Sequence, residues 1–287
     1  MRIHHLLQFS VAVASLCLSQ NLHAEERKTL LQWSYGTSFE GGPDLSKPLV
    51  TDRPDFTEAS TTVGRGVVQI EGGYTFTHDD DAGVRTDTHS FPETLLRVGM
   101  FAEWFEFRAD WNYLIEETAT AGLTTRQSGA EDLTLGVKIA LTPQECILPE
   151  TGIIFQFSVP TGADAFTADE VLPGVNYLYG WELNEDLTLG ASTGVTAAND
   201  DITNDTYDQF SQSFTLGYSW TDKIKSYTEW YVLAPVSADT DRPQNYFNGG
   251  FTYLLSNDVQ WDIRAGVGLN EAADDYFVGT GLSVRYW

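Results

Sequence analysis

Twelve segments of the chain alternate apolar and polar residues, and this period of two limits the possible folds more than any other feature of the sequence. Segment 259–269, for example, sets Trp261 and Ile263 against Gln260 and Asp262. The segments have roughly the 9–11 residues that a tilted strand needs to cross the hydrocarbon of a bilayer. We predict strands near 67–77, 90–101, 104–115, 131–141, 151–159, 171–181, 187–197, 207–220, 223–233, 245–255, 259–269 and 276–287.

The connections between these segments alternate in length, which is typical of outer-membrane barrels with short periplasmic turns and longer outer loops. A periplasmic β-sandwich also has regular short strands, but it would need neither lipid-facing aromatic residues nor this alternation. We therefore predict an all-β fold, a closed antiparallel transmembrane barrel of about twelve strands with both termini in the periplasm. The expected outer loops are 78–90, 116–131, 160–171, 198–208, 235–245 and 270–275.

Both ends of the chain carry features of an exported protein. Residues 1–24 place an apolar run from Leu6 to Leu18 after Arg2 and end in Leu-His-Ala24, so we expect a signal peptide that is cleaved near Ala24. The last predicted strand ends on Tyr286 and Trp287, which we expect to be the signal read by the barrel-assembly machinery. The expected location is the outer membrane of a Gram-negative bacterium.

Residues 25–60 form a separate N-terminal segment before the barrel, which we assign to 61–287. The segment is polar, is interrupted by Gly and Pro, and carries charges of both signs. One interpretation is a plug that enters the lumen; the other is a disordered periplasmic tail. The candidate plug residues are Thr51, Asp52, Arg53, Pro54, Asp55, Phe56 and Glu58.

Thirteen charged residues fall on the polar face of the predicted strands. A charge is costly on the lipid face of a barrel and acceptable in the lumen, so we place them on the inner wall. They either create a field that selects solutes in an open pore or form an ion-paired filling of a closed barrel. They are Glu71, Glu93, Arg97, Glu106, Arg108, Asp110, Asp132, Lys138, Lys225, Glu229, Asp262, Arg264 and Arg285.

The net charge of −25 makes nucleic acid an improbable partner. Many of the acids lie in the expected outer loops, where clustered oxygens could hold Ca²⁺ that bridges to lipopolysaccharide phosphates. The alternative is a solvated acidic surface, and we expect no cofactor. The candidate cation-binding residues are Asp79, Asp80, Asp81, Asp200, Asp201 and Asp205.

Two stretches, Thr51–Glu58 and Gly66–Tyr74, resemble the opening of a family of outer-membrane proteins named for the MetA-pathway of phenol degradation. The end of the chain, Gly281–Tyr286, is also similar to that family's ending, with Trp287 as an addition. The resemblance implies a barrel that takes up small molecules, with aromatic or hydrophobic solutes as the expected class.

An enzyme is not expected, because the mature chain has only His78 and His89 and no Gly-x-Ser-x-Gly elbow. We expect an outer-membrane channel or transporter for small molecules. The alternative is a structural, lipopolysaccharide-binding or adhesin-like barrel without a transport role. The expected partners are outer-membrane lipid, lipopolysaccharide, the barrel-assembly machinery and a small-molecule solute.

Overall fold

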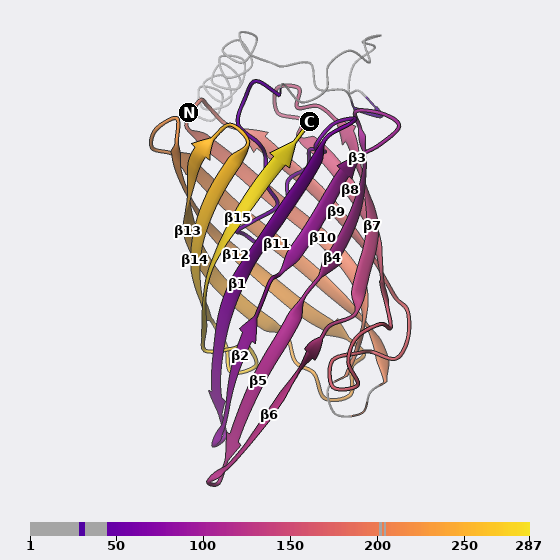
Figure 1. Ribbon diagram of the computed structural model, residues 1–287, viewed down its shortest axis with the longest axis vertical. Helices are drawn as coiled ribbons and strands as arrows, with labels where there is room; N and C mark the ends of the chain where they lie inside the picture. Colours follow the sequence, from indigo (N-terminus) through magenta and orange to yellow (C-terminus); the bar gives the residue numbers. More distant parts are fainter. Residues whose placement is uncertain (1–28, 32–44, 201–202, 204) are drawn as a thin grey trace, which may run out of the picture.

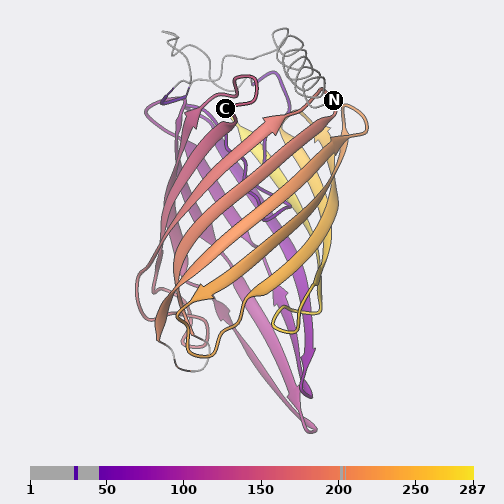
Figure 2. The ribbon, with the colours of Figure 1, turned by 180° about the vertical axis from the view of Figure 1, so that it is seen from behind.

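The chain forms a closed antiparallel β-barrel in a computed structural model that describes residues 29–31, 45–200, 203 and 205–287 (Figure 1 and Figure 2). The first strands are β1 (Val68–Asp81), β2 (Val84–Ser90), β3 (Thr94–Gly99), β4 (Phe105–Trp111), β5 (Tyr113–Thr120), β6 (Leu123–Ala130), β7 (Leu133–Thr142) and β8 (Glu150–Val159). They are followed by β9 (Leu172–Glu182), β10 (Leu187–Asn199), β11 (Thr206–Ser219), β12 (Ile224–Val236), β13 (Gln244–Ser256), β14 (Val259–Gly268) and β15 (Tyr276–Tyr286).

The barrel closes where β15 pairs with β1, in a register that sets Tyr286 opposite Val68. The fifteen strands make twelve wall strands, since three of these are each interrupted once. The interruptions lie between β2 and β3, between β4 and β5 at Asn112, and between β6 and β7. The predicted twelve-stranded antiparallel barrel is therefore confirmed, and each predicted strand overlaps a wall strand.

The two faces of each wall strand differ as a barrel in a bilayer requires. On β15, Gly281 and Ser283 are buried toward the lumen, whereas Leu282 and Tyr286 are 45% and 56% exposed. Apolar side chains on the outer face meet lipid, and polar ones on the inner face meet the lumen. In the part of the chain that the structure describes, no helix is long and apolar enough to span a membrane.

Two of the expected outer loops, 78–90 and 116–131, are largely strand, so the prediction of loops there is wrong. Strands β1, β2, β5 and β6 continue beyond the barrel as a four-stranded extension, which we call the tongue (Figure 1). Its two hairpins turn at Ala82-Gly83 and Ala121-Gly122, and all four of these residues have positive φ. Two-residue turns of this kind match the twist of antiparallel strands and let the pairing continue.

Candidate functional site

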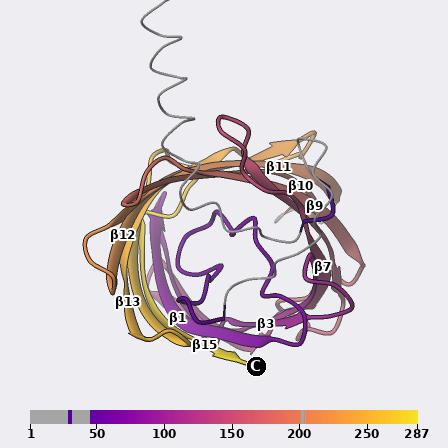
Figure 3. The same cartoon turned by 90° about the horizontal axis from the view of Figure 1, so that it is seen from above.

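Residues 45–67, which we call the inner segment, lie inside the barrel near the end at which β15 finishes (Figure 3). The segment joins β1 directly and is largely buried: Leu49 is 5%, Asp52 6% and Val63 5% exposed. Residues 45–60 of it belong to the N-terminal region for which we weighed a plug against a tail, and residues 61–67 come from the part that we assigned to the barrel. Its contacts with the wall define the candidate site.

Asp52 lies at the centre of a buried ionic cluster. The Nζ atom of Lys138 donates to both of its carboxylate oxygens at 2.8 Å, and Arg108 donates to one of them. Arg97 is a further partner, at 3.4 Å from the Asp52 carboxylate. Burial alone would raise the pKa of Asp52, but these three cations outweigh it and hold the pKa well below its usual range.

Two acids of the wall complete this cluster. Glu71 accepts hydrogen bonds from the backbone N–H groups of Asp52 and Arg53 at 3.0 Å. Arg97 donates to Glu71 at 3.0 Å and to Glu106 at 2.9 Å, and all three side chains are 0% exposed. Each buried charge has a partner of opposite sign, which is the condition under which a buried ion is tolerated.

Arg53 crosses the seam at which the barrel closes. Its guanidinium donates to Glu93 at 2.8 Å and to Asp262 at 3.4 Å. Gly73 and Gly281 face each other across β1 and β15, and an added Cβ at either one would lie 2.3 Å from the guanidinium. The absence of both side chains therefore makes room for Arg53.

The next residues of the inner segment bind the opposite wall. The backbone N–H groups of Phe56 and Thr57 donate to Glu229 at 2.8 and 2.7 Å. Arg264 donates to the carbonyl oxygen of Pro54 at 2.9 Å. Burial and the nearby Glu229 carboxylate raise the pKa of Asp55 well above its usual range.

Other contacts fasten the two ends of the inner segment. Arg108 pairs with Glu58, and Glu106 accepts a hydrogen bond from the backbone N–H of Val63 at 2.9 Å. At the start of the segment, Arg285 donates to the carbonyl oxygens of Leu45 and Lys47, both at 2.9 Å. The contacts therefore extend along most of the segment.

Ten of the thirteen predicted lumen charges contact the inner segment directly. The other three lie elsewhere: Asp110 is exposed on β4, and Lys225 is exposed at the start of β12. Asp132 lies between β6 and β7 and accepts hydrogen bonds from backbone N–H groups of the β8–β9 loop, including Gly162 at 2.8 Å. The ten are Glu71, Glu93, Arg97, Glu106, Arg108, Lys138, Glu229, Asp262, Arg264 and Arg285.

An aromatic stack on the inner wall was missed by the sequence analysis. Phe56 stacks on Tyr231 with 4.4 Å between ring centroids and 5° between planes. Tyr231 stacks on Tyr246 at 4.8 Å, and Tyr246 contacts Phe277 edge-on at 6.3 Å. One sequence pattern could have indicated this stack: Tyr227 and Tyr231 both fall on the polar, inward face of their strand.

The acidic outer loops were weighed as a cation site, and the described part of them can be compared with that prediction. In the described residues, no group of three or more Asp, Glu, His or Cys side chains has an arrangement that could hold a metal ion. Asp200 is 1% exposed and accepts from the backbone N–H and side-chain O–H of Thr240, which joins two outer loops. Asp80 donates its backbone N–H to Asp275, and Asp201 lies outside the described residues.

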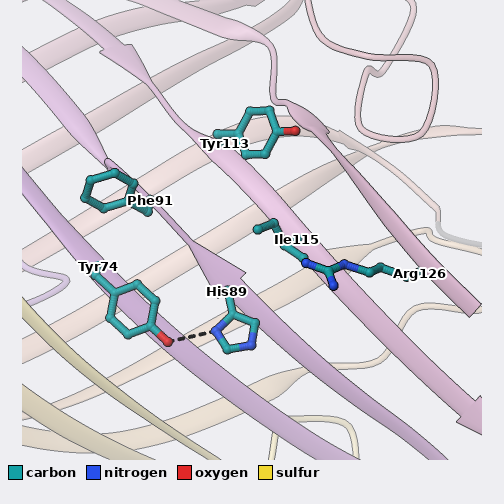
Figure 4. Close-up of a pocket in the computed structure, with 6 residues that line it drawn as sticks. All are labelled: Tyr74, His89, Phe91, Tyr113, Ile115 and Arg126. Atoms are coloured by element: carbon teal, nitrogen blue, oxygen red, sulfur yellow. Dashed lines mark hydrogen bonds between the residues drawn. The ribbon is translucent and has the colours of Figure 1, made fainter.

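The two histidines of the described residues, His78 and His89, lie at the tongue. A hollow of about 440 Å³ on its outer face is lined by Tyr74, His89, Phe91, Tyr113, Ile115 and Arg126 (Figure 4). The hydroxyl of Tyr74 and Nδ1 of His89 are 2.7 Å apart, and Nδ1 of His78 is 2.6 Å from Asp87. These contacts bring no serine to either imidazole.

Residues 51–286 match the family described as "Putative MetA-pathway of phenol degradation". The chain belongs to this family. The resemblance seen at Thr51–Glu58 and at Gly281–Tyr286 is therefore confirmed. Among curated proteins, none matches this sequence.

Two solved structures are similar to this member of the MetA-pathway family. An outer membrane channel from Pseudomonas putida F1 has a TM-score of 0.62 at 13% identity, over 79% of this chain and 98% of that chain. The transport unit of the autotransporter AIDA-I from Escherichia coli has a TM-score of 0.50 at 10% identity, over 77% of this chain and 89% of that chain. At these identities the likeness establishes the fold, which is a barrel of the outer-membrane type.

Proposed function

We propose that this chain is a non-enzymatic outer-membrane channel for small solutes, and that the inner segment narrows its lumen. In this proposal 1–24 is a signal peptide, 25–60 contains the plug and 61–287 is the barrel. The observation that carries it is that ten wall charges, spread over several strands, bind the inner segment. Ion pairs of this kind are specific, because a buried charge without its partner is strongly unfavourable.

We also propose that the solutes are aromatic or hydrophobic. Tyr231, Tyr246 and Phe277 form a row of aromatic side chains on the inner wall, next to Phe56 of the inner segment. The family description, which names phenol degradation, supports an aromatic class, and the description of the Pseudomonas putida F1 protein as an outer membrane channel supports passage of solutes. The proposed location in the outer membrane follows from the type of barrel.

Deletion of 25–60 tests the proposal. We expect the deleted protein to remain a heat-modifiable barrel and its single-channel conductance in planar bilayers to rise. The matched control is Asp132→Asn, which changes a contact of an outer loop and should leave the conductance unchanged. An unchanged conductance in a correctly folded deletion would show that the segment does not limit the pore.

A second candidate function is a lipopolysaccharide-binding or adhesin-like barrel, with a role for the tongue. The observation that favours it is the length of the tongue and the exposure of its last strand, β6, from Leu123 to Ser128. The tongue's removal would distinguish the two functions. Loss of surface binding with normal conductance would favour the second, whereas altered conductance would favour the channel.

A further inference from the structure

The stack of Phe56 on Tyr231 joins the inner segment to the aromatic side of the lumen. Phe56 is the only aromatic side chain of the inner segment, residues 45–67. It lies almost parallel to Tyr231, which is itself stacked on Tyr246 at 19° between planes. Stacked aromatic rings attract each other beyond the effect of the area they bury. The segment therefore fills a position that suits a flat ring.

The same place has a strong hydrogen-bond donor. Arg264 donates from one terminal nitrogen to the carbonyl oxygen of Pro54 at 2.9 Å and from the other to Thr75 at 2.8 Å. Its guanidinium also lies 5.5 Å from the ring centroid of Phe277. Pro54 and Phe56 thus present an oxygen acceptor and an aromatic ring to one part of the wall.

Two further donor atoms at this place, one on Arg264 itself and one on Tyr227, are buried without a hydrogen-bond partner among the described residues. They are the Nε atom of Arg264 and the hydroxyl of Tyr227. Both lie in one row across the wall, in which Tyr227 is opposite Gly250, Gly250 is opposite Arg264 and Arg264 is opposite Gly279. A buried donor without a partner is costly, and an added acceptor oxygen would remove that cost.

We propose that Pro54 and Phe56 occupy a binding site for an aromatic solute, and that the solute releases the inner segment by taking their place. The ligand class is an aromatic ring that carries an oxygen acceptor, such as a phenolic or carboxylate oxygen. Its ring stacks on Tyr231, and its oxygen accepts from Arg264 and Tyr227. This inference rests on the proposed channel function and deepens it, because it links the solute to the opening of the lumen.

The site selects on two separate features of the ligand. A guanidinium favours an anionic acceptor, so a carboxylate binds more strongly than a neutral oxygen. A flat ring is needed for the stack on Tyr231, so a saturated ring of similar size and charge gains less. Benzoate therefore has both features, whereas cyclohexanecarboxylate has only the charge and toluene only the ring.

The test measures release of the inner segment directly by thiol labelling. The full-length barrel carries Cys146→Ser, which removes an exposed thiol, together with Ala59→Cys in the inner segment. We expect benzoate to raise the rate of labelling by a water-soluble maleimide about three- to tenfold, which corresponds to the energy of the stack. Equal effects of benzoate and cyclohexanecarboxylate, or no effect of benzoate, would overturn the proposal.

Single substitutions distinguish specific binding of benzoate at this site from a general loosening of the inner segment. Tyr231→Leu should abolish the response to benzoate, and Phe56→Leu should lower the benzoate concentration that is needed. Tyr253→Leu is the matched control, since Tyr253 lies on the outer face of β13, the strand that also carries Tyr246, and is 39% exposed. The Tyr253→Leu protein should show the same increase in labelling with benzoate as the parent protein. A full response in Tyr231→Leu would refute the assignment of the site.

Conductance measured on the same proteins distinguishes this inference from the channel function. If deletion of 25–60 raises the conductance but benzoate does not change labelling, the channel stands and the aromatic site is wrong. If benzoate increases labelling but neither it nor the deletion changes the conductance, the site exists and the proposed channel function is wrong.

Discussion

The buried carboxylate of Asp52 contacts three cations, which depend on it to different degrees. Lys138 is 0% exposed and has Asp52 as its carboxylate partner in the described part of the chain, at 2.8 Å. Arg97 and Arg108 also contact Glu71, Glu58 or Glu106, so they keep a partner when Asp52 is neutralised. The ammonium of Lys138 is therefore the group that loses most.

The substitution Asp52→Asn tests this dependence. It removes one charge from a buried pair, which costs about 3–5 kcal/mol. We expect this loss to weaken docking of the inner segment, so that the single-channel conductance rises while the barrel stays heat-modifiable. The matched control is Asp186→Asn in the exposed turn before β10. A closed channel in a folded Asp52→Asn protein would contradict the role of this cluster.

Docking of the inner segment should also depend on pH through Asp55. Burial and Glu229 raise the pKa of Asp55 in the docked segment, whereas a released segment has the ordinary value near 3.8. The docked state therefore binds the proton more tightly. Its extra stability is fully present below 3.8 and is lost as the pH rises through the raised pKa.

The measurement is conductance across a pH series from about 4 to 8, over which carboxyl groups in proteins titrate. We expect conductance to increase with pH, because docking weakens. Asp55→Asn should flatten the curve and hold the conductance low at neutral pH. Glu58, whose pKa is also raised by burial despite the opposing charge of Arg108, leaves a residual slope. A conductance that decreases as the pH rises would contradict the role assigned to Asp55.

At the scale of elements, the wall strands could be predicted and the tongue could not. The alternation of apolar and polar side chains along a strand is a local pattern. It can be recognised from the sequence alone, for example at Trp261 and Ile263. Asp79-Asp80-Asp81 and Thr118-Ala119-Thr120 lack the aromatic residues of the wall, and this polarity favoured loops. The two Ala-Gly turns at 82–83 and 121–122 were the missed signal for hairpins.

The candidate site was predictable in part for a similar reason. The charges of the inner wall could be found from the sequence, because a charge is costly on the lipid face of a barrel strand, and the mixed charges of Asp52-Arg53 marked a candidate plug. Their pairing could not, since it depends on which strands lie opposite in the closed barrel. Phe56 and Tyr231 meet across 175 positions of the sequence, and no local pattern indicates that contact.

A wall glycine offers a test of docking that changes no charge. An added Cβ at Gly152 on β8 would lie 2.5 Å from the backbone oxygen of Ser60, which cannot rotate away. We expect Gly152→Ala to destabilise docking by about 1–3 kcal/mol, as overpacking does, and to raise the conductance. At the matched control, Gly217→Ala, the nearest atom is the side-chain oxygen of Thr188 on the neighbouring wall strand.

The two glycine variants should therefore differ in conductance and not in barrel stability. Heat-modifiability of both proteins on gels measures the barrel, and planar bilayers measure the lumen. A rise of similar size in both would mean that the effect comes from strain in the wall and not from the inner segment.

For the whole molecule, the end of the chain matters because β15 closes the barrel. Tyr286 lies opposite Val68, at the start of β1, and Trp287 is 71% exposed beyond it. We expect deletion of Tyr286 and Trp287 to leave the protein in the periplasm, since the proposed assembly signal is lost. Fractionation followed by a heat-modifiability gel measures this. Normal barrel in the outer membrane after the deletion would refute the signal.

The position of Arg53 has a consequence for the order of biogenesis. Its receptacle is formed by Gly73 on the first strand and Gly281 on the last, with Asp262 on β14. Gly73 and Gly281 are separated by most of the chain. They become neighbours only when β15 pairs with β1 and closes the barrel. An unfinished barrel therefore lacks the complete binding position for Arg53, so the final placement of this side chain follows closure of the wall.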